Sequence, residues 1–255
     1  MKYFLYMLAV TIVMVVLAAI YMHSQKFGRI SSGIRLEKIQ KSTNYKNRKF
    51  QNIYKLRADT PTCKLNAYKK LFGIIGKFIA RKNDISIPSI KTDLMNLNKN
   101  EDILVWFGHS SYFIQIEGKR IAVDPVLSDV SSPILFFPVA FRGTHVYTAT
   151  EIPELDYLII THDHWDHLDY ETVTKLKAKQ IICPLGVGAH FEHWGFAQSK
   201  LLEMDWYDEV KLEDGFRIIC CPTQHFSGRG FTRNKSLWGA FLLIFSSVKH
   251  LSIFY

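Results

Sequence analysis

The segment that most constrains this chain is Thr161–Asp169, where three histidines and two aspartates fall between positions 162 and 167. It directly follows three apolar residues, so a buried strand is predicted to end in a loop rich in metal-ligand side chains. Because alternate side chains of an extended segment point the same way, His162 and His164 can hold one ion together. Past the bend, Asp166 and His167 can face a second ion, at the separation of roughly 3.5–4 Å usual in two-metal sites.

A cluster of this kind differs from the isolated histidines among the ten in this chain, which are usually core or surface residues. A packed core would bury so many polar groups only at a cost, unless each one had a partner. Neutral imidazoles and carboxylates suit zinc, and they favour it over iron or manganese. The motif therefore predicts a zinc-binding loop.

The motif at 161–169 resembles the metal-binding signature of the metallo-β-lactamase-fold hydrolases. The surrounding sequence is similar to one branch of them, the N-acyl-phosphatidylethanolamine-hydrolysing phospholipase D-like proteins and the related sugar-phosphate lactonases. The supporting stretches are Trp106–Ser111, Asp124–Val126, Pro184–Gly186, Gln224–Ser227 and Leu237–Gly239. The resemblance covers residues 28–255 and implies a layered α/β fold, the metallo-β-lactamase αββα sandwich.

A second predicted strand end, after residues 216–221, delivers another histidine, His225. With His162 and His164 it completes a set of three imidazoles, the ligand count of a catalytic zinc with one open position. The resemblance supports this assignment, since it aligns His225 with a family ligand. We expect these three side chains to converge although they come from distant parts of the chain.

The resemblance also implies roles around the second metal. Asp166 and His167 are its expected ligands, and Asp166 is the expected catalytic proton acceptor. His109 is expected near the site without being a usual ligand, and a structural turn histidine is the alternative. Asp124 is a candidate partner for a ligand imidazole.

Downstream of His225 the family pattern is interrupted. The family requires a metal-bridging aspartate and a last histidine there, but no aspartate or glutamate follows His225, and the only later histidine is His250. We therefore expect one firm zinc site, a second site that is weak or empty, and a sandwich whose second half is incomplete. A C-terminally shortened product is the favoured explanation, and a mononuclear variant completed by another chain is the alternative.

The amino terminus contains an uncharged run, Tyr3–Met22, in which Thr11 is the only clearly polar residue. It is long enough to cross roughly 30 Å of hydrocarbon as a helix. We predict a single-pass transmembrane anchor, with a cleaved signal peptide as the alternative, and basic residues after the span place the body on the cytoplasmic side. The predicted domains are an anchor (1–25), a basic neck and N-terminal extension (26–100), and an incomplete metallo-β-lactamase-like domain (101–255).

A formal net charge of +9 suits an anionic partner, here an anionic lipid or a phosphate ester at a membrane. A solubilising surface beside an anionic membrane is the alternative. No nucleic-acid partner is expected, because the basic residues gather next to the span. The four cysteines have no C-x-x-C spacing and are predicted to be free thiols.

The remaining pattern alternates strands and helices, as expected for an α/β layered fold. Predicted strands are 103–107, 112–116, 120–124, 180–183, 200–206, 208–212 and 216–221, and predicted helices are 67–81, 168–177 and 187–194. Asp169 is expected to cap the helix over 168–177 and aim its positive end at the metals. The apolar loop 131–142 is expected to form the wall of an acyl-chain pocket or a lid that dips into the membrane, and packing on the core is the alternative.

These expectations describe a zinc-dependent hydrolase. Zinc lowers the pKa of a bound water, and the resulting hydroxide attacks a phosphodiester, acyl or lactone centre. The span, the basic neck and the apolar loop favour a phospholipid-like phosphodiester. An anchored lactonase or nuclease of the same fold and a catalytically inactive truncated remnant are the alternatives.

Overall fold

The computed structural model describes residues 2–54, 87–129, 131–133, 143–212, 215–245 and 250–253. The predicted amphipathic helix at 67–81 and most of the apolar loop at 131–142 lie outside these residues.

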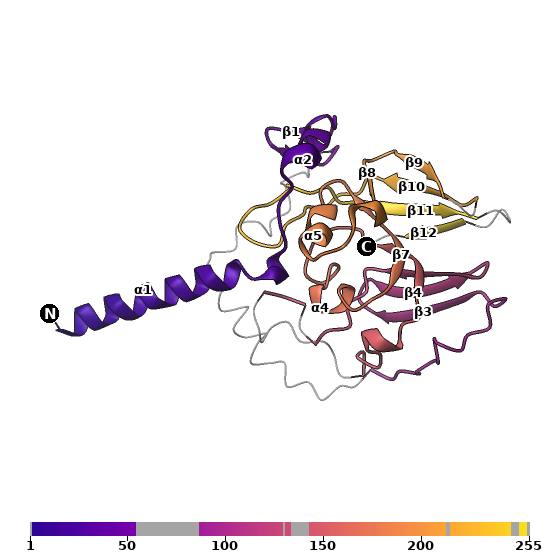
Figure 1. The fold of residues 1–255 in the computed structure, drawn as a ribbon, viewed down its shortest axis with the longest axis horizontal. Helices are drawn as coiled ribbons and strands as arrows, with labels where there is room; N and C mark the ends of the chain where they lie inside the picture. Colours follow the sequence, from indigo (N-terminus) through magenta and orange to yellow (C-terminus); the bar gives the residue numbers. More distant parts are fainter. Residues whose placement is uncertain are drawn as a thin grey trace.

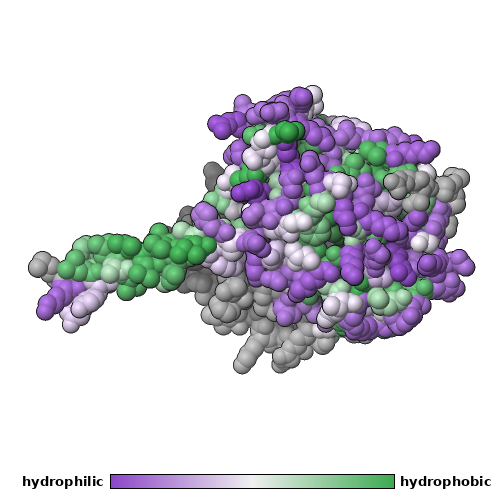
Figure 2. Space-filling model, in the orientation of Figure 1, coloured by the Kyte–Doolittle hydropathy of each residue, from purple (hydrophilic) through white to green (hydrophobic). Residues whose placement is uncertain are grey.

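Helix α1, Lys2–Met22, coincides with the predicted span, and none of its residues is buried. It is long and apolar enough to cross a membrane, although a signal sequence fits the same description. Thr11, the one clearly polar residue between Tyr3 and Met22, is satisfied within the helix, because its hydroxyl donates to the Met7 carbonyl over 2.9 Å. Figure 1 shows α1 projecting away from the body, and Figure 2 shows its largely hydrophobic surface beside a mostly hydrophilic body.

The segment after α1 packs against the body. It contains the short helix η1 (Gln25–Phe27), helix α2 (Gly33–Gln40) and the hairpin strands β1 (Tyr45–Lys46) and β2 (Lys49–Phe50). Ile39 of α2 and Phe50 of β2 are fully buried in the main core. The Arg35 guanidinium pairs with Glu203 over 2.6 Å. Residues 33–50 are therefore part of the folded body.

One sheet has six strands in the order β3-β4-β5-β6-β7-β8. The strands are β3 (Ile103–Gly108), β4 (Ser111–Ile116), β5 (Lys119–Val123), β6 (Leu155–Ile159), β7 (Ala178–Pro184) and β8 (Leu201–Met204). The first three form an antiparallel meander, as predicted, and the pairings from β5 to β8 are parallel. The short helices η3 (Ala149–Glu151) and η4 (Gln198–Lys200) precede β6 and β8.

The second sheet is antiparallel, with the order β12-β11-β10-β9. Its strands are β9 (Glu209–Lys211), β10 (Arg217–Cys221), β11 (Ala240–Ile244) and β12 (His250–Ile253). Alternate residues of β6 divide between two cores: Ile159 packs with Ile218 between the sheets, whereas Leu158 packs on the other face with Val173 and Phe191. Helices α4 (Tyr170–Val173) and α5 (Gly188–His193) cover that face. The predicted α/β layered fold is confirmed.

One helix prediction needs adjustment. The helix expected over 168–177 forms only at α4, because tight turn bonds from Lys175 to Thr172 and from Leu176 to Val173 replace regular helical bonds before β7 begins. Asp169 does cap α4, because its carboxylate accepts from the Glu171 amide over 3.2 Å. A helix of one turn, however, does not give the site the positive end of a long helix that was expected. No helix follows β8 within the part of the chain described above, so three layers of the sandwich are seen there.

Candidate metal centre

Three histidines from two sheets converge at one point. His162 and His164 follow β6, and His225 follows β10. His162 Nε2 lies 2.9 Å from His164 Nδ1, and His225 Nε2 lies 3.1 Å from His162 Nε2 and 3.2 Å from His164 Nδ1. Two nitrogens held tetrahedrally by one zinc at about 2.0–2.1 Å are roughly 3.3 Å apart, so this arrangement fits a single ion.

The electrostatics of this cluster keep its imidazoles neutral. Burial, reinforced by the neighbouring imidazoles, holds the pKa of His162 well below its ordinary value. Burial likewise lowers the pKa of His164, and burial together with His164 lowers the pKa of His225 to about 4. Because a metal binds the unprotonated nitrogen, three neutral imidazoles at pH 7 are a competent ligand set.

A second cluster adjoins the first and includes His109, which was expected near the site but not as a ligand. The ligand atoms of His109, Asp166 and His167 lie within 4.8 Å of one another. His109 Nε2 is 3.3 Å from Asp166 Oδ2, and the rings of His162 and His167 are 4.0 Å apart. The second site was expected to have only Asp166 and His167, so His109 gives it a third candidate ligand.

Charge pairing shifts the pKa values in this second cluster. Burial alone would raise the pKa of Asp166, but the hydrogen bond with His109 and the nearby His167 bring it down to about 2. The same hydrogen bond raises the pKa of His109. Asp166 is therefore ionised at neutral pH and can serve as a ligand or a proton acceptor.

His109 has an uncommon backbone conformation. His109 follows β3 with φ +45°, a left-handed conformation that is uncommon for residues other than glycine. Such conformations gather at functional sites. The sequence showed a histidine at a predicted strand end, and the resemblance placed it near the site without a ligand role. The order of strands in the sheet brings it to the metal loop.

Asp124, at the end of β5, supports the second cluster as expected. Its carboxylate is fully buried and lies 2.8 Å from His167 Nδ1. It also accepts hydrogen bonds from the Thr161 amide (2.8 Å) and hydroxyl (2.5 Å). A carboxylate on Nδ1 orients the imidazole and leaves Nε2 available as a ligand atom.

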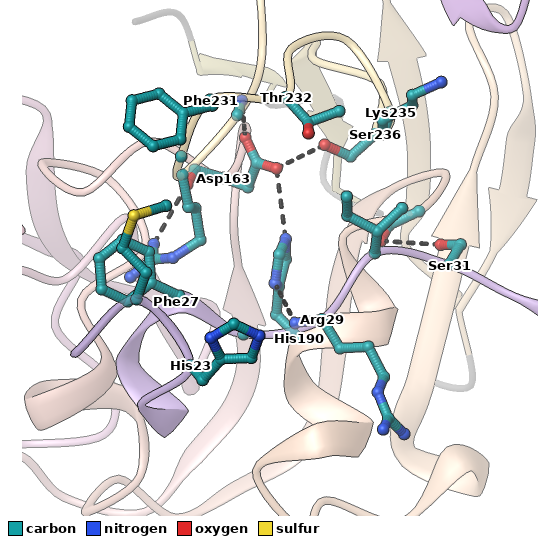
Figure 3. Close-up of a pocket in the computed structure, with 17 residues that line it drawn as sticks. His23, Phe27, Arg29, Ser31, Asp163, His190, Phe231, Thr232, Lys235 and Ser236 are labelled. Carbon is teal, nitrogen blue, oxygen red and sulfur yellow. Dashed lines mark hydrogen bonds and ion pairs between the residues drawn. The ribbon is translucent and has the colours of Figure 1, made fainter. Parts of the chain in front are cut away.

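Asp163 faces away from both clusters, into the neighbouring pocket shown in Figure 3. It accepts from the Gly228 amide and the Ser236 hydroxyl, both over 2.6 Å, and from His190 Nε2 over 3.2 Å. His190 Nδ1 in turn accepts from the Arg29 amide over 3.1 Å. Asp163 therefore joins the metal loop to the segment after His225, and its partners lower its pKa to about 2 although burial opposes this.

Arg229 is a second buried connector that the sequence did not reveal. Its guanidinium donates to the carbonyl groups of Leu168 (2.6 Å), Asp163 (3.1 Å) and Lys26 (2.8 Å). It also lies 4.1 Å from the centre of the Trp165 ring. Burial lowers its pKa to about 10, so it keeps its charge at neutral pH. It fastens the segment after α1 to the metal loop.

The remaining predictions for side chains concern cysteines. Cys183 and Cys220 are buried and Cys221 is half-buried, and all three are free thiols. Burial raises the pKa of each. Cys63 lies outside the described residues.

Comparison with protein families agrees with a metal site at this position. A model described as the beta-lactamase superfamily domain matches residues 119–255, more than half of the chain. The chain therefore belongs to the beta-lactamase superfamily.

Particular relatives are more distant. An uncharacterized protein of Mycobacterium tuberculosis is 34% identical over 175 residues, which cover 67% of this chain and 46% of that protein. The N-acyl-phosphatidylethanolamine-hydrolyzing phospholipase D 1 of Caenorhabditis elegans is 29% identical over 54% of this chain and 42% of its own. Among solved structures, CmlA, a diiron beta-hydroxylase from Streptomyces venezuelae, has a TM-score of 0.46 at 23% identity, covering 60% of this chain and 29% of its own. The chain spans less than half the length of both sequence relatives.

Proposed function

We propose that this protein is a membrane-anchored, zinc-dependent hydrolase of phospholipid-like phosphodiesters. The observation that carries the proposal is the convergence of His162, His164 and His225 from two sheets at nitrogen separations of 2.9–3.2 Å. Membership of the beta-lactamase superfamily supports it. The domain boundaries proposed for this function are an anchor (1–25), a neck and extension (26–100) and the hydrolase domain (101–255).

In this proposal, His162, His164 and His225 hold the first zinc, and His109, Asp166 and His167 offer a second, weaker site. A bound divalent metal supplies Lewis-acid polarisation and lowers the pKa of a bound water towards 7. Asp124 orients His167 through Nδ1. With a pKa of about 2, Asp166 is ionised at neutral pH and can accept a proton at Oδ2 beside His109.

The substrate class follows from three features that agree. The name of the Caenorhabditis elegans relative describes hydrolysis of an N-acyl-phosphatidylethanolamine. Helix α1 has the length and composition of a span, and the net charge of +9 favours an anionic partner. A lipid phosphodiester combines the apolar and anionic parts that these features would recognise. The basic residues after the span favour a cytoplasmic position for the body by the positive-inside rule.

The test is to purify the full chain in detergent, measure metal per chain, and assay a lipid phosphodiester, bis(p-nitrophenyl) phosphate and a lactone. His225→Ala removes a ligand, and His193→Ala on α5 is the matched control. We expect zinc in the wild type and phosphodiester turnover that falls by more than about 100-fold in His225→Ala, because both depend on the same three nitrogens. The control should keep both.

Wild-type chain that binds no metal, or turnover that survives in His225→Ala, contradicts the proposal. Metal binding without turnover of any substrate assigns the chain to the inactive alternative. Preference for the lactone over both diesters keeps the hydrolase but replaces its substrate class.

A further inference from the structure

A cavity of about 500 Å³ lies beside the three-histidine cluster and reaches it at His164. Its volume is in the range of roughly 300–1,000 Å³ typical of pockets for small ligands. Most of the lining residues come from two places: Ala18, Tyr21 and Met22 lie on α1, and six others lie between Phe226 and Arg233 after β10. Phe27, Pro133, His164 and Trp165 complete the lining. The membrane-proximal end of α1 is thus a wall of the cavity next to the candidate metals.

Helix α1 is seated firmly enough to act as a wall. The Tyr21 hydroxyl donates to the Pro133 carbonyl over 2.6 Å, and its ring packs on Phe27 at 5.6 Å. Phe27 packs in turn on Trp165 at 5.0 Å, and the Trp165 indole donates to the Arg229 carbonyl over 3.1 Å. Trp165 lies within the metal loop, so aromatic contacts run without a break from the helix end to the site.

The wall formed by the segment after β10 carries exposed aromatic side chains. The Phe231 side chain is 90% exposed, and it lines the cavity together with Phe27 and the half-exposed Phe226. Phe27 and Phe231 lie on the same side of the adjoining pocket in Figure 3. Exposed aromatic groups gathered at one place mark binding sites for apolar ligands or membranes.

A positive charge lines the same cavity as His164. The guanidinium of Arg233 is exposed and lies 4.8 Å from the centre of the Phe226 ring. The same ring is 4.5 Å from that of His164. The cavity therefore presents apolar surface at α1 and a cation beside the metal candidates, which matches a molecule with an apolar chain and an anionic group.

We propose that this cavity is an acyl-chain site that a lipid enters directly from the bilayer along α1. The apolar exposed surface of α1 continues into Ala18, Tyr21 and Met22, so an acyl chain passing along it stays in apolar surroundings. Arg233 receives the anionic head group. The inference rests on the proposed function and deepens it by giving α1 a role in substrate binding as well as anchoring.

Ala18 and Ala19 provide a matched test, because both lie on α1 and only Ala18 lines the cavity. The full-length proteins carrying Ala18→Phe and Ala19→Phe are placed in phosphatidylcholine vesicles and assayed on a long-chain phosphodiester lipid and on soluble bis(p-nitrophenyl) phosphate. We expect Ala18→Phe to lower kcat/KM for the lipid at least tenfold and to leave the soluble diester unchanged. Ala19→Phe should change neither. Equal effects of the two variants, or an equal loss on both substrates, overturn the acyl site.

A binding readout separates this inference from the proposed function. Vesicle lipids with brominated acyl chains quench nearby tryptophans, and the share due to Trp165 is the difference between wild type and Trp165→Phe. We expect that share to be clear in the wild type and at least halved in Ala18→Phe, with or without turnover. Absence of turnover on every substrate refutes the hydrolase alone, whereas absence of quenching at Trp165 refutes the acyl site alone.

Discussion

At the scale of single residues, two aspartates of one motif have opposite orientations. Asp163 points away from the clusters to Gly228, Ser236 and His190, and Asp166 lies beside His109. The alternation of an extended segment explains the first, since a residue between His162 and His164 must face the other way. The chemistry of the site therefore depends on position along the backbone as well as residue type.

The carboxylate of Asp124 gives a residue-scale prediction. Asp124→Asn should weaken metal binding at the second cluster by about 10–100-fold, because an amide cannot accept from both Thr161 and His167 as the carboxylate does. Competition with a chromophoric chelator measures the affinity. Asp156→Asn is the control, since Asp156 pairs with Lys179 away from the clusters. Equal affinities in the two variants, at unchanged far-UV circular dichroism, would show that Asp124 has no part in metal binding.

At the scale of elements, two side chains hold the segment after α1 in place. His190 of α5 contacts this segment at Arg29, and Arg229 joins Lys26 to the metal loop. A Cβ added at Gly28 would lie 2.0 Å from His190 Nδ1, and the same ring accepts from the Arg29 amide. His190 cannot retreat without weakening its bond to Asp163. The fit of this segment and the shape of the metal loop are therefore linked.

Gly28→Ala and Gly33→Ala test this link. Both glycines have positive φ, +68° and +55°, but an added Cβ at Gly33 meets nothing within 4 Å. Both variants carry the backbone strain, and Gly28→Ala alone adds overpacking that costs about 1–3 kcal/mol. We expect a lower thermal midpoint and faster tryptic cleavage after Arg29 in Gly28→Ala than in Gly33→Ala. Identical midpoints and cleavage rates would show that the segment is not held at His190.

Predictability from sequence differs among these elements for physical reasons. The strands β3, β4 and β5 were predicted because their apolar runs are separated by short turns. Strands β4 and β5 lie between two packed faces, whereas Leu104 and Trp106 of β3 are exposed. The length of helix α4 was overestimated, because the sequence pattern does not reveal that the chain must turn into β7 by Ala178. His109 was missed as a third group of the second cluster because strand order, which no local pattern encodes, brings it to His167.

At the scale of the whole molecule, a basic layered body is joined to an apolar helix with no buried residue. Figure 2 shows this contrast. A surface of this kind is costly in water, and the length and composition of α1 fit either a bilayer span or a signal sequence. Tyr21 at the end of α1 packs on Phe27, and Phe27 packs on Trp165 of the metal loop, so the fold sets the position of α1 relative to the site.

Val13→Arg and Ile34→Arg test the membrane assignment, since both replace an exposed aliphatic side chain with the same cation. Val13 lies near the middle of α1, and Ile34 lies on α2 and is 83% exposed. A charge at the centre of a span costs about 2.5–3.5 kcal/mol on insertion scales. We therefore expect wild type and Ile34→Arg to stay in the membrane pellet after alkaline carbonate washing, and Val13→Arg to be released substantially. If the mature wild-type protein begins after Met22 and is soluble, α1 is a signal sequence, and the acyl site loses the helix that forms its wall.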